Sequence, residues 1–376
     1  MSKNRFARIG RASAALVLIA VLAACSTSKP KPAELPANVA LLGVRQAWNV
    51  KVGEVGFPLD VNVQGGTVTL ASSNGNVSAL DARTGRELWR TAVGTPLSAG
   101  VGSDGKLTSV VTTGNDLVGL EAGKEIWRQK LNAQAFTAPL VAGGRVFLLA
   151  ADRSVSAFDG QSGRRLWTQT RTGEPLVLLQ GGVLMAVGDT LVVGLSGRLV
   201  GMNPNNGSVR WEAPIAAPRG TNDVERLVDL VGHTSRVGDV VCARAFQSNV
   251  GCVNTTRGTL VWSKASVGYE GVAGDDRLVF GSEGDGKVSA WRRTDGNPAW
   301  TVDRLKYRTL SAPLAVGRSV VVGDNTGLVH FLSREDGSPL TRLTTDGSPI
   351  AAAPVLAGDT VVVVTRNGGI FGFQPE

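Results

Sequence analysis

Few side chains in this 376-residue chain are suited to catalysis or metal binding, and the two histidines and three cysteines are the first to consider. His233 and His330 belong to no His-x-x-x-His or Cys-x-x-Cys pattern, so the spacing of a metal site is missing. No segment resembles a nucleophile elbow, a Gly-rich phosphate loop or a pair of catalytic carboxylates. We therefore expect no catalytic residue, no metal and no cofactor, and a protein that is not an enzyme.

Two of the cysteines, Cys242 and Cys252, lie at equal distances on either side of Gln247, which falls in the middle of a predicted hairpin turn. They should face one another across two strands, and an oxidising compartment would permit a disulfide between them. Three alternatives stay open from the sequence: a structural disulfide, two reduced and buried thiols, or a redox-active pair.

The third cysteine, Cys25, follows a segment typical of a secretory signal peptide over residues 1–24. Met1–Arg11 carries four basic residues and no acid, and Ala12–Ala24 is a small and apolar run that is too short to span a bilayer, which takes about 20 residues. Leu22-Ala23-Ala24-Cys25 resembles the lipobox of bacterial lipoproteins. The alternative is an ordinary signal peptide with Ala-x-Ala cleavage and an incidental cysteine.

The lipobox resemblance implies that Cys25 becomes the first residue of the mature protein and is acylated on its sulfur and its amine. Several acyl chains, at about 0.8 kcal/mol per buried methylene, would anchor a soluble domain firmly. Ser26 in place of Asp favours the outer membrane. Residues 25–43 hold three prolines between Pro30 and Pro36, and we expect them to form an extended tether that holds the rest of the protein off the lipid surface.

The remaining chain repeats one motif, VSALDARTGRELW over Val77–Trp89, at intervals of about 40 residues, which indicates a repeat architecture. The positions that close the motif are Trp48, Trp89, Trp127, Trp167, Trp211, Trp262, Trp300 and, without a tryptophan, Thr341. Within a repeat, runs such as Thr67–Leu70 alternate with period two and are joined at turns such as Asn74-Gly75, so each repeat has material for four short antiparallel strands.

Repeated four-stranded units predict an all-β fold, an eight-bladed β-propeller of PQQ-like, Trp-docking repeats over residues 44–376. The first run, Val44–Trp48, has no hairpin of its own, and the last hairpin, Val361–Phe373, has no closing tryptophan. We expect the two to pair and complete the eighth blade, which also removes two exposed sheet edges. The leader carries four of the basic residues, so the +8 of the whole chain falls to +4, and without a basic run between aromatics we expect no nucleic-acid partner.

Two consecutive repeats, those that follow Trp167 and Trp211, carry the longest intervals before the next hairpin. The first holds Pro175–Gly181, which is apolar without alternation, and the second holds Pro218–Val231, which is rich in charge. Insertions at the same point of neighbouring blades extend one patch on one face, and an apolar anchor beside a charged loop is typical of a protein-binding surface. The alternative is that the first is core and the second a solvated loop.

Lipobox, proline-rich tether and repeats of the form ALD-x-x-TG-x-x-x-W together resemble the outer membrane protein assembly factor BamB family, lipoprotein propellers of the machine that inserts β-barrel proteins. In that family a Leu-x-Leu-Arg-Gly stretch and an acidic loop bind the core protein BamA through a POTRA domain. Here they match Val177–Gly181 and Glu225–Val231. Val177, Gln180 and Val231 depart from the family pattern, and the charges lost at Gln180 and Val231 weigh against a salt bridge at those two positions.

The resemblance implies a scaffold in the outer membrane, lipid-anchored and facing the periplasm, that binds a BamA-type partner and assists unfolded outer-membrane clients. The residues expected to bind the partner are Leu176, Val177, Leu178, Leu179, Gln180, Arg226 and Asp229. Leu179 and Asp229 are expected as contacts and Arg226 as a support of the loop.

Two further functions remain as alternatives. The repeat is shared with quinone (PQQ)-dependent dehydrogenases, which use adjacent cysteines and a calcium site that this sequence lacks. A polymer-binding envelope lipoprotein would need aromatic side chains in its loops, and only Trp291 stands outside the repeat position.

Overall fold

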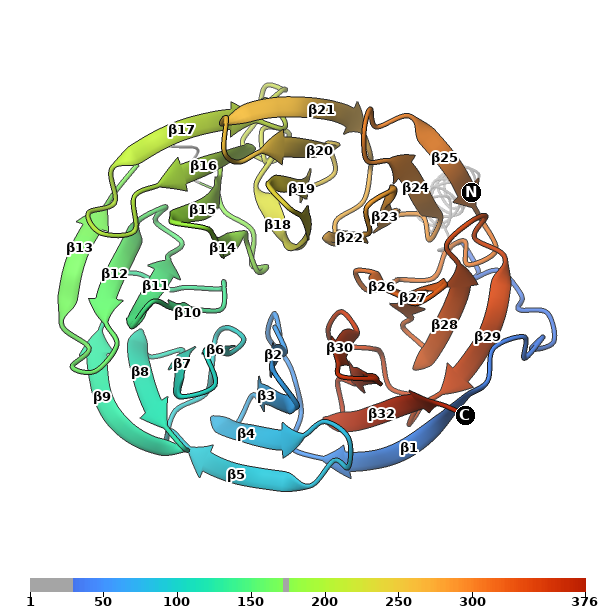
Figure 1. Ribbon diagram of the computed structural model, residues 1–376, viewed down its shortest axis with the longest axis horizontal. Helices are drawn as coiled ribbons and strands as arrows, with labels where there is room; N and C mark the ends of the chain where they lie inside the picture. Colours follow the sequence, from blue (N-terminus) through green and yellow to red (C-terminus); the bar gives the residue numbers. More distant parts are fainter. Residues whose placement is uncertain (1–29, 172–175) are drawn as a thin grey trace, which may run out of the picture.

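The computed structural model describes residues 30–171 and 176–376, so Cys25 and the predicted signal peptide lie outside the described residues. Thirty-two strands form eight four-stranded antiparallel sheets, arranged as blades around a central axis (Figure 1). The predicted eight-bladed β-propeller is thus confirmed. Among the described residues there is no helix of the length and apolarity needed to cross a membrane.

The first four blades follow one another along the chain, each ordered from the axis outward. Blade 1 is β2 (Asn62–Gln64), β3 (Thr67–Ala71), β4 (Asn76–Asp81) and β5 (Glu87–Ala92). Blade 2 is β6 (Gly102–Ser103), β7 (Leu107–Val111), β8 (Asp116–Glu121) and β9 (Lys124–Lys130). Blade 3 is β10 (Leu140–Ala142), β11 (Arg145–Leu149), β12 (Val155–Asp159) and β13 (Arg165–Gln169). Blade 4 is β14 (Leu184–Val187), β15 (Thr190–Leu195), β16 (Arg198–Met202) and β17 (Val209–Pro214).

The next three blades repeat this order, and the eighth combines both ends of the described chain. Blade 5 is β18 (Leu230–Val237), β19 (Val240–Ala245), β20 (Asn249–Asn254) and β21 (Thr259–Ala265). Blade 6 is β22 (Val272–Gly274), β23 (Leu278–Ser282), β24 (Val288–Arg292) and β25 (Pro298–Val302). Blade 7 is β26 (Leu314–Val316), β27 (Ser319–Gly323), β28 (Leu328–Ser333) and β29 (Pro339–Thr344). Blade 8 is β30 (Val355–Ala357), β31 (Thr360–Val364), β32 (Gly369–Pro375) and β1 (Val44–Lys51).

The core lies between the blades. The two middle strands of a blade, such as β3 and β4, are buried at nearly every position, because both faces of the sheet pack on neighbouring blades. The outer strand β5 alternates between exposed and half-buried positions because it forms the rim. This burial explains the Val-rich middle runs of each repeat.

In every blade except blade 7, the repeat tryptophan packs on a glycine of the next blade. The Trp127 indole of blade 2 donates a 2.8 Å hydrogen bond from Nε1 to the Gly160 carbonyl of blade 3. Its ring lies against Gly163, where a Cβ would come within 2.6 Å of the indole and where φ is +68°. The turn glycine of the repeat, Gly163 in blade 3, is therefore the docking site for the tryptophan of the preceding blade.

The ring is closed as predicted by β1 and β32, which pair from Val44 opposite Pro375 to Lys51 opposite Gly369. This closure explains why the seventh repeat lacks a tryptophan. Blade 8 takes its outer strand from the N-terminal side of the chain, so it has no Thr-Gly turn between its third and fourth strands. The residue opposite Thr341 is Phe331, whereas Ala79 and Gly119 stand opposite repeat tryptophans, so a bulky residue on the facing strand replaces the missing ring.

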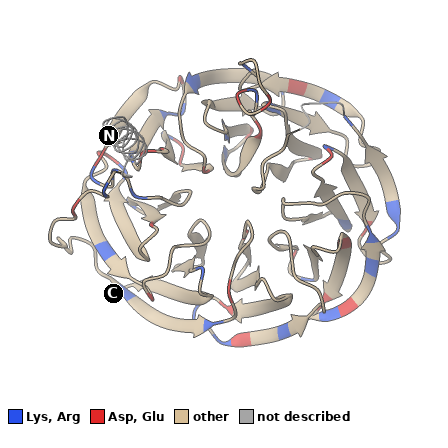
Figure 2. Ribbon diagram, turned by 180° about the vertical axis from the view of Figure 1, so that it is seen from behind, with Lys and Arg blue, Asp and Glu red and all other residues tan. Residues whose placement is uncertain are grey.

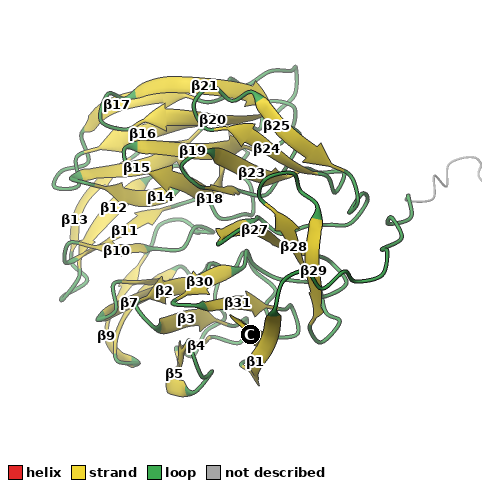
Figure 3. Cartoon of the chain, turned by 45° about the vertical axis from the view of Figure 1, so that its right-hand side comes forward, coloured by secondary structure: helices red, strands yellow, loops and turns green. Residues whose placement is uncertain are grey.

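The sequence predicts an extended tether over residues 25–43, and its described part, residues 30–43, contains no helix or strand but lies against the ring. From Pro36 to Leu41 it lies along β29, the outer strand of blade 7, and Figure 3 shows the chain passing this strand before it enters β1. The Asn38 amide donates to the Arg342 carbonyl at 3.0 Å and accepts from the Arg342 N–H at 2.9 Å, and Leu41 N–H donates to the Leu340 carbonyl at 2.6 Å. The outer edge of β29 offers backbone N–H and C=O groups that no further strand of the blade pairs. Hydrogen bonds to these groups stabilise the docked stretch relative to a stretch extended into solvent.

Candidate partner-docking surface

The two insertions predicted to bind a partner lie side by side. Residues 176–183 lead into β14, and the loop of residues 215–229 joins β17 to β18. Gly182 forms a β-bridge with Val231, and the Gly232 N–H donates to the Gly181 carbonyl at 2.9 Å. Both segments connect the outer strand of one blade to the inner strand of the next, and we call the face of the disc that carries these connections the interblade face. Figure 2 looks onto this face.

A buried ion pair holds the two insertions together. Arg153 Nη1 lies 2.8 Å from Asp229 Oδ1, and Arg153 Nη2 donates to the Leu176 carbonyl at 2.9 Å. The side chains of Arg153 and Asp229 are 8% and 17% exposed. The second carboxylate oxygen of Asp229 accepts from the Leu178 N–H at 3.4 Å. Asp229 therefore acts inside the protein, where it positions residues 176–178, and little of it faces a partner.

The sequence did not identify Arg153 as a functional residue, although its position in a turn is unusual. It occupies the turn between β11 and β12 with a left-handed φ of 64°, at the place where most other blades carry Gly or Asn, such as Gly75 and Gly327. A non-glycine residue in this conformation is strained, and such strain concentrates at sites with a specific task. An Arg in a turn position where most other repeats carry Gly or Asn is the sequence feature that could have identified Arg153.

The exposed apolar groups of this region come from two loops. Leu179 is 74% exposed and Leu176 is 38% exposed, whereas Val177, Leu178 and Gln180 are half-buried. The Gln180 side chain donates to the Tyr269 carbonyl at 2.8 Å, which brings the loop between β21 and β22 alongside. That loop presents Val267, which is 62% exposed and which the sequence did not predict to bind a partner. Leu176, Leu179 and Val267 are the exposed apolar side chains of these two neighbouring loops, and we call them together the docking patch.

The charged loop flanks this patch with a single helical turn. The Asn222 side chain accepts from the Glu225 N–H at 2.9 Å, and Glu225 Oε2 accepts from the Thr221 N–H at 2.8 Å, a reciprocal arrangement like a capping box. The hydrogen bond from Thr221 is the main reason that the pKa of Glu225 lies below its usual value. The turn displays Val224, which is 72% exposed, and the exposed Arg226.

The docking patch borders a cavity on the axis of the ring. The cavity has a volume of about 520 Å³, and its wall includes Leu179, Gln180 and, from blades 1 and 5, Asp60 and His233. His233 Nε2 lies 3.4 Å from Asp60 Oδ1. Glu270 also lines the wall, and burial raises its pKa to about 7 against the opposing charges of Arg244 and Arg366. Within residues 30–171 and 176–376, no three His, Cys, Asp or Glu side chains are grouped so that they could hold a metal ion.

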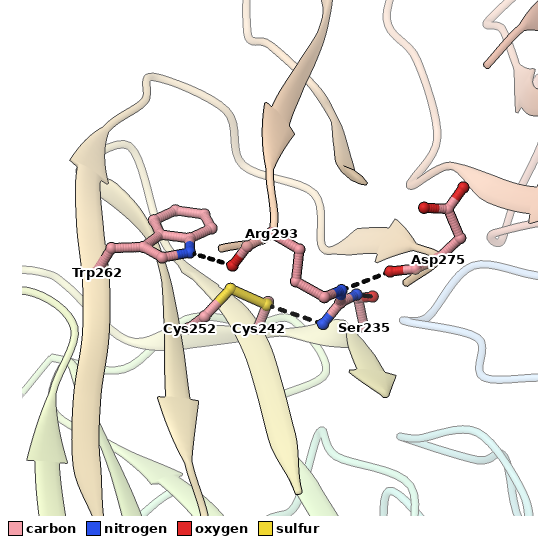
Figure 4. Close-up of a disulfide and its surroundings, with 6 residues drawn as sticks. All are labelled: Ser235, Cys242, Cys252, Trp262, Asp275 and Arg293. Atoms are coloured by element: carbon pink, nitrogen blue, oxygen red, sulfur yellow. Dashed lines mark hydrogen bonds between the residues drawn. A yellow bond between two sulfur atoms is a disulfide. The ribbon is translucent and has the colours of Figure 1, made fainter. Parts of the chain in front are cut away.

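The two cysteines of blade 5 face one another directly on β19 and β20 and are joined as a disulfide in the structure (Figure 4). Both are fully buried. The Arg293 guanidinium donates to Cys242 Sγ at 3.2 Å, and the Trp262 indole donates to the Arg293 carbonyl at 2.7 Å. The pair thus lies at the contact between blades 5 and 6, in a structural setting.

Comparisons with known proteins agree with this architecture. The family described as outer membrane protein assembly factor BamB matches residues 73–302. A BamB of Burkholderia pseudomallei is 39% identical, covering 99% of this chain and 100% of its own, and one of Bordetella pertussis is 34% identical, covering 98% of each.

Among solved structures, BamB from Moraxella catarrhalis superposes with a TM-score of 0.79 at 21% identity, covering 88% of this chain and 99% of its own. A quinohemoprotein alcohol dehydrogenase from Comamonas testosteroni reaches a TM-score of 0.70 at 14% identity, covering 92% of this chain and 79% of its own. At these identities both likenesses concern the fold alone.

Proposed function

The chain belongs to the family of the outer membrane protein assembly factor BamB, and from this premise we propose that it is a non-catalytic scaffold of the β-barrel assembly complex. It binds the core assembly protein and assists the insertion of β-barrel proteins into the outer membrane. The observation that carries the proposal is the docking patch, a set of exposed leucine and valine side chains on neighbouring loops. The buried Arg153–Asp229 pair holds the loop of Leu176 in place.

The partner is a BamA-type protein, which uses one of its periplasmic POTRA domains. Leu179 enters an apolar depression on that domain, and Leu176 and Val267 exclude water around it, because the energy of such interfaces concentrates in a few central apolar side chains. Arg226 lies at the rim, where charges set register and association rate more than affinity. Asp229 contributes indirectly, since its carboxylate fixes the loop that carries Leu176 and Leu178.

The proposal includes a lipid anchor at Cys25, which places the ring at the periplasmic side of the outer membrane. Unfolded clients would reach the machine beside the ring, whose outer strands offer backbone groups for pairing. Blade 7 is the exception, because residues 36–41 already lie along its outer strand.

Affinity capture from detergent-solubilised outer membranes tests the partner. Leu179→Ala should lower recovery of the core assembly protein at least about tenfold, the loss expected when a central anchor is truncated. Leu88→Ala, which alters an exposed leucine on the outer strand of blade 1, is the matched control and should leave recovery unchanged. Equal recovery with both variants would remove the docking patch from the proposal.

A further inference from the structure

We infer that the rim of the ring at blades 6 and 7 rests on the bilayer surface and meets lipid headgroups through Tyr307, Lys306, Arg304 and Lys31. The inference depends on the proposed anchor at Cys25. It adds a membrane-contacting surface and a fixed orientation of the disc.

The first step is the point at which the N-terminal stretch joins the ring. The Ala33 N–H donates to the Lys306 carbonyl at 2.9 Å, and the Arg308 guanidinium donates to the Ala33 carbonyl at 3.2 Å. Leu35 packs against the buried Leu305 and Leu332. Residue 33 is therefore fixed to the loop between β25 and β26.

A buried network supports this attachment. Arg308 Nη1 lies 3.0 Å from Asp324 Oδ2, and His330 Nε2 lies 3.0 Å from the same oxygen. Burial alone would raise the pKa of Asp324, but hydrogen bonds from His330 and Thr326 hold it well below its usual range. The carboxylate stays charged and keeps Arg308 oriented toward Ala33.

The second step is the reach of the chain. Ala33 lies eight positions after Cys25, and even a fully extended chain of eight residues spans at most about 28 Å. If all of residues 25–43 were free, the reach would be about 60 Å. Docking along blade 7 therefore halves the largest possible distance between Cys25 and the ring. It keeps the rim of blades 6 and 7 close to the acyl chains.

The third step is the chemistry of that rim. Tyr307 is 44% exposed, with Lys306 Nζ 5.2 Å from the centre of its ring, and Arg304 on the same loop and Lys31, two residues before Ala33, are exposed as well. Aromatic rings with a polar tip and basic side chains are the groups enriched at membrane interfaces. Glu34 and Asp303 are exposed in the same region, so the contact is amphipathic and not purely electrostatic. Figure 2 shows charges of both signs where the chain leaves the ring.

The orientation has a consequence for the partner. The loop between β25 and β26 lies on the interblade face, as do the loops that carry the docking patch. The point at which the N-terminal stretch joins the ring and the docking patch are thus on one face of the disc, so on this inference the partner domain approaches from that face beside the bilayer.

Spin labels on the lipidated full chain test this orientation in vesicles of phosphatidylethanolamine and phosphatidylglycerol that contain a nickel-chelating lipid. Labels are attached at Tyr307→Cys and, on the outer strand of the opposite blade, at Arg165→Cys. The label at residue 307 should be relaxed strongly by the headgroup nickel and the label at residue 165 weakly. Leu35→Asp, which undocks the stretch, should abolish most of the relaxation at residue 307.

The outcomes separate the inference from the function on which it rests. Protein that floats with the vesicles while both labels relax equally would overturn the orientation alone. Protein that fails to float, with an unmodified Cys25 by mass spectrometry, would overturn the anchor and the orientation together. Capture of the core assembly protein through Leu179 tests the partner without reference to either.

Discussion

Arg153 Nη1 and Asp229 Oδ1 are 2.8 Å apart, although the two residues are 76 positions apart in the chain. The pair joins a turn of blade 3 to the loop before blade 5, and it also holds the Leu176 carbonyl. Two loops with little secondary structure of their own acquire one defined arrangement through this contact. The exposed side chains of the docking patch depend on it for their positions.

Truncation of this pair should destabilise the fold more than any surface ion pair. Arg153→Ala leaves the Asp229 carboxylate largely buried and uncompensated, which costs about 3–5 kcal/mol in the free energy of unfolding. Urea unfolding provides the measurement. Arg90→Ala, which removes an exposed ion pair with Glu87, is the control and should cost about 0.5 kcal/mol or less. A loss at residue 153 no larger than that of the control would contradict a buried pair.

The repeat tryptophans should matter far more than the residue that replaces one of them. Trp127→Ala empties a buried site between blades 2 and 3 and breaks the hydrogen bond to Gly160, for a cost of about 3–5 kcal/mol. Thr341→Ala should cost about 1 kcal/mol or less, because Phe331 already fills the facing position. Thermal unfolding of the two variants measures the contrast, and similar losses would show that blade 7 also relies on this position as a clamp.

The disulfide of blade 5 should be present in protein taken from the periplasm. Intact-mass measurement should show alkylation of Cys242 and Cys252 only after reduction. The Cys242→Ala, Cys252→Ala double variant should lose about 3 kcal/mol of stability, the entropy expected for a loop of this length. Alkylation without reductant would identify two buried thiols instead.

Stability should fall as the pH rises through the range in which Glu270 titrates. Its folded-state pKa, about 7, lies above the unfolded value of 4.5, so the folded protein holds a proton that the unfolded chain has lost between those limits. The associated stability is fully present below about pH 4.5 and is lost as the pH approaches and passes 7. Denaturation at pH 5 and pH 8 should show a drop that Glu270→Gln reduces. An equal drop in that variant would assign the pH dependence to other groups.

The sequence was sufficient for the ring because every blade repeats the same local pattern and the two ends complete one period. The pairing of β1 with β32 follows because the incomplete first and last repeats together have the length of one blade. The place of the insertions was predictable for the same reason, since a longer interval in two consecutive repeats must fall on one face. Leu179 accordingly lies exposed at the predicted surface.

Contacts between distant loops were not predictable, because they follow no period. Asp229 belongs to the family motif, yet its role depends on Arg153, whose turn carries no functional motif. Composition indicated an extended conformation before β1, but it could not reveal that Asn38 would match the free backbone groups of Arg342. Val267 was missed because its loop is distant in the chain and is brought to the loop of Leu179 by the hydrogen bond between the Gln180 side chain and the Tyr269 carbonyl.

Site-specific photocrosslinking in living cells tests the central claim most directly. A photoreactive phenylalanine derivative replaces Leu179 in one variant and Leu88 in another, and crosslinked products are identified by mass spectrometry. The account predicts a crosslink from residue 179 to a periplasmic domain of the core assembly protein and none from residue 88. A crosslink to that protein from residue 88 and none from residue 179 would contradict it.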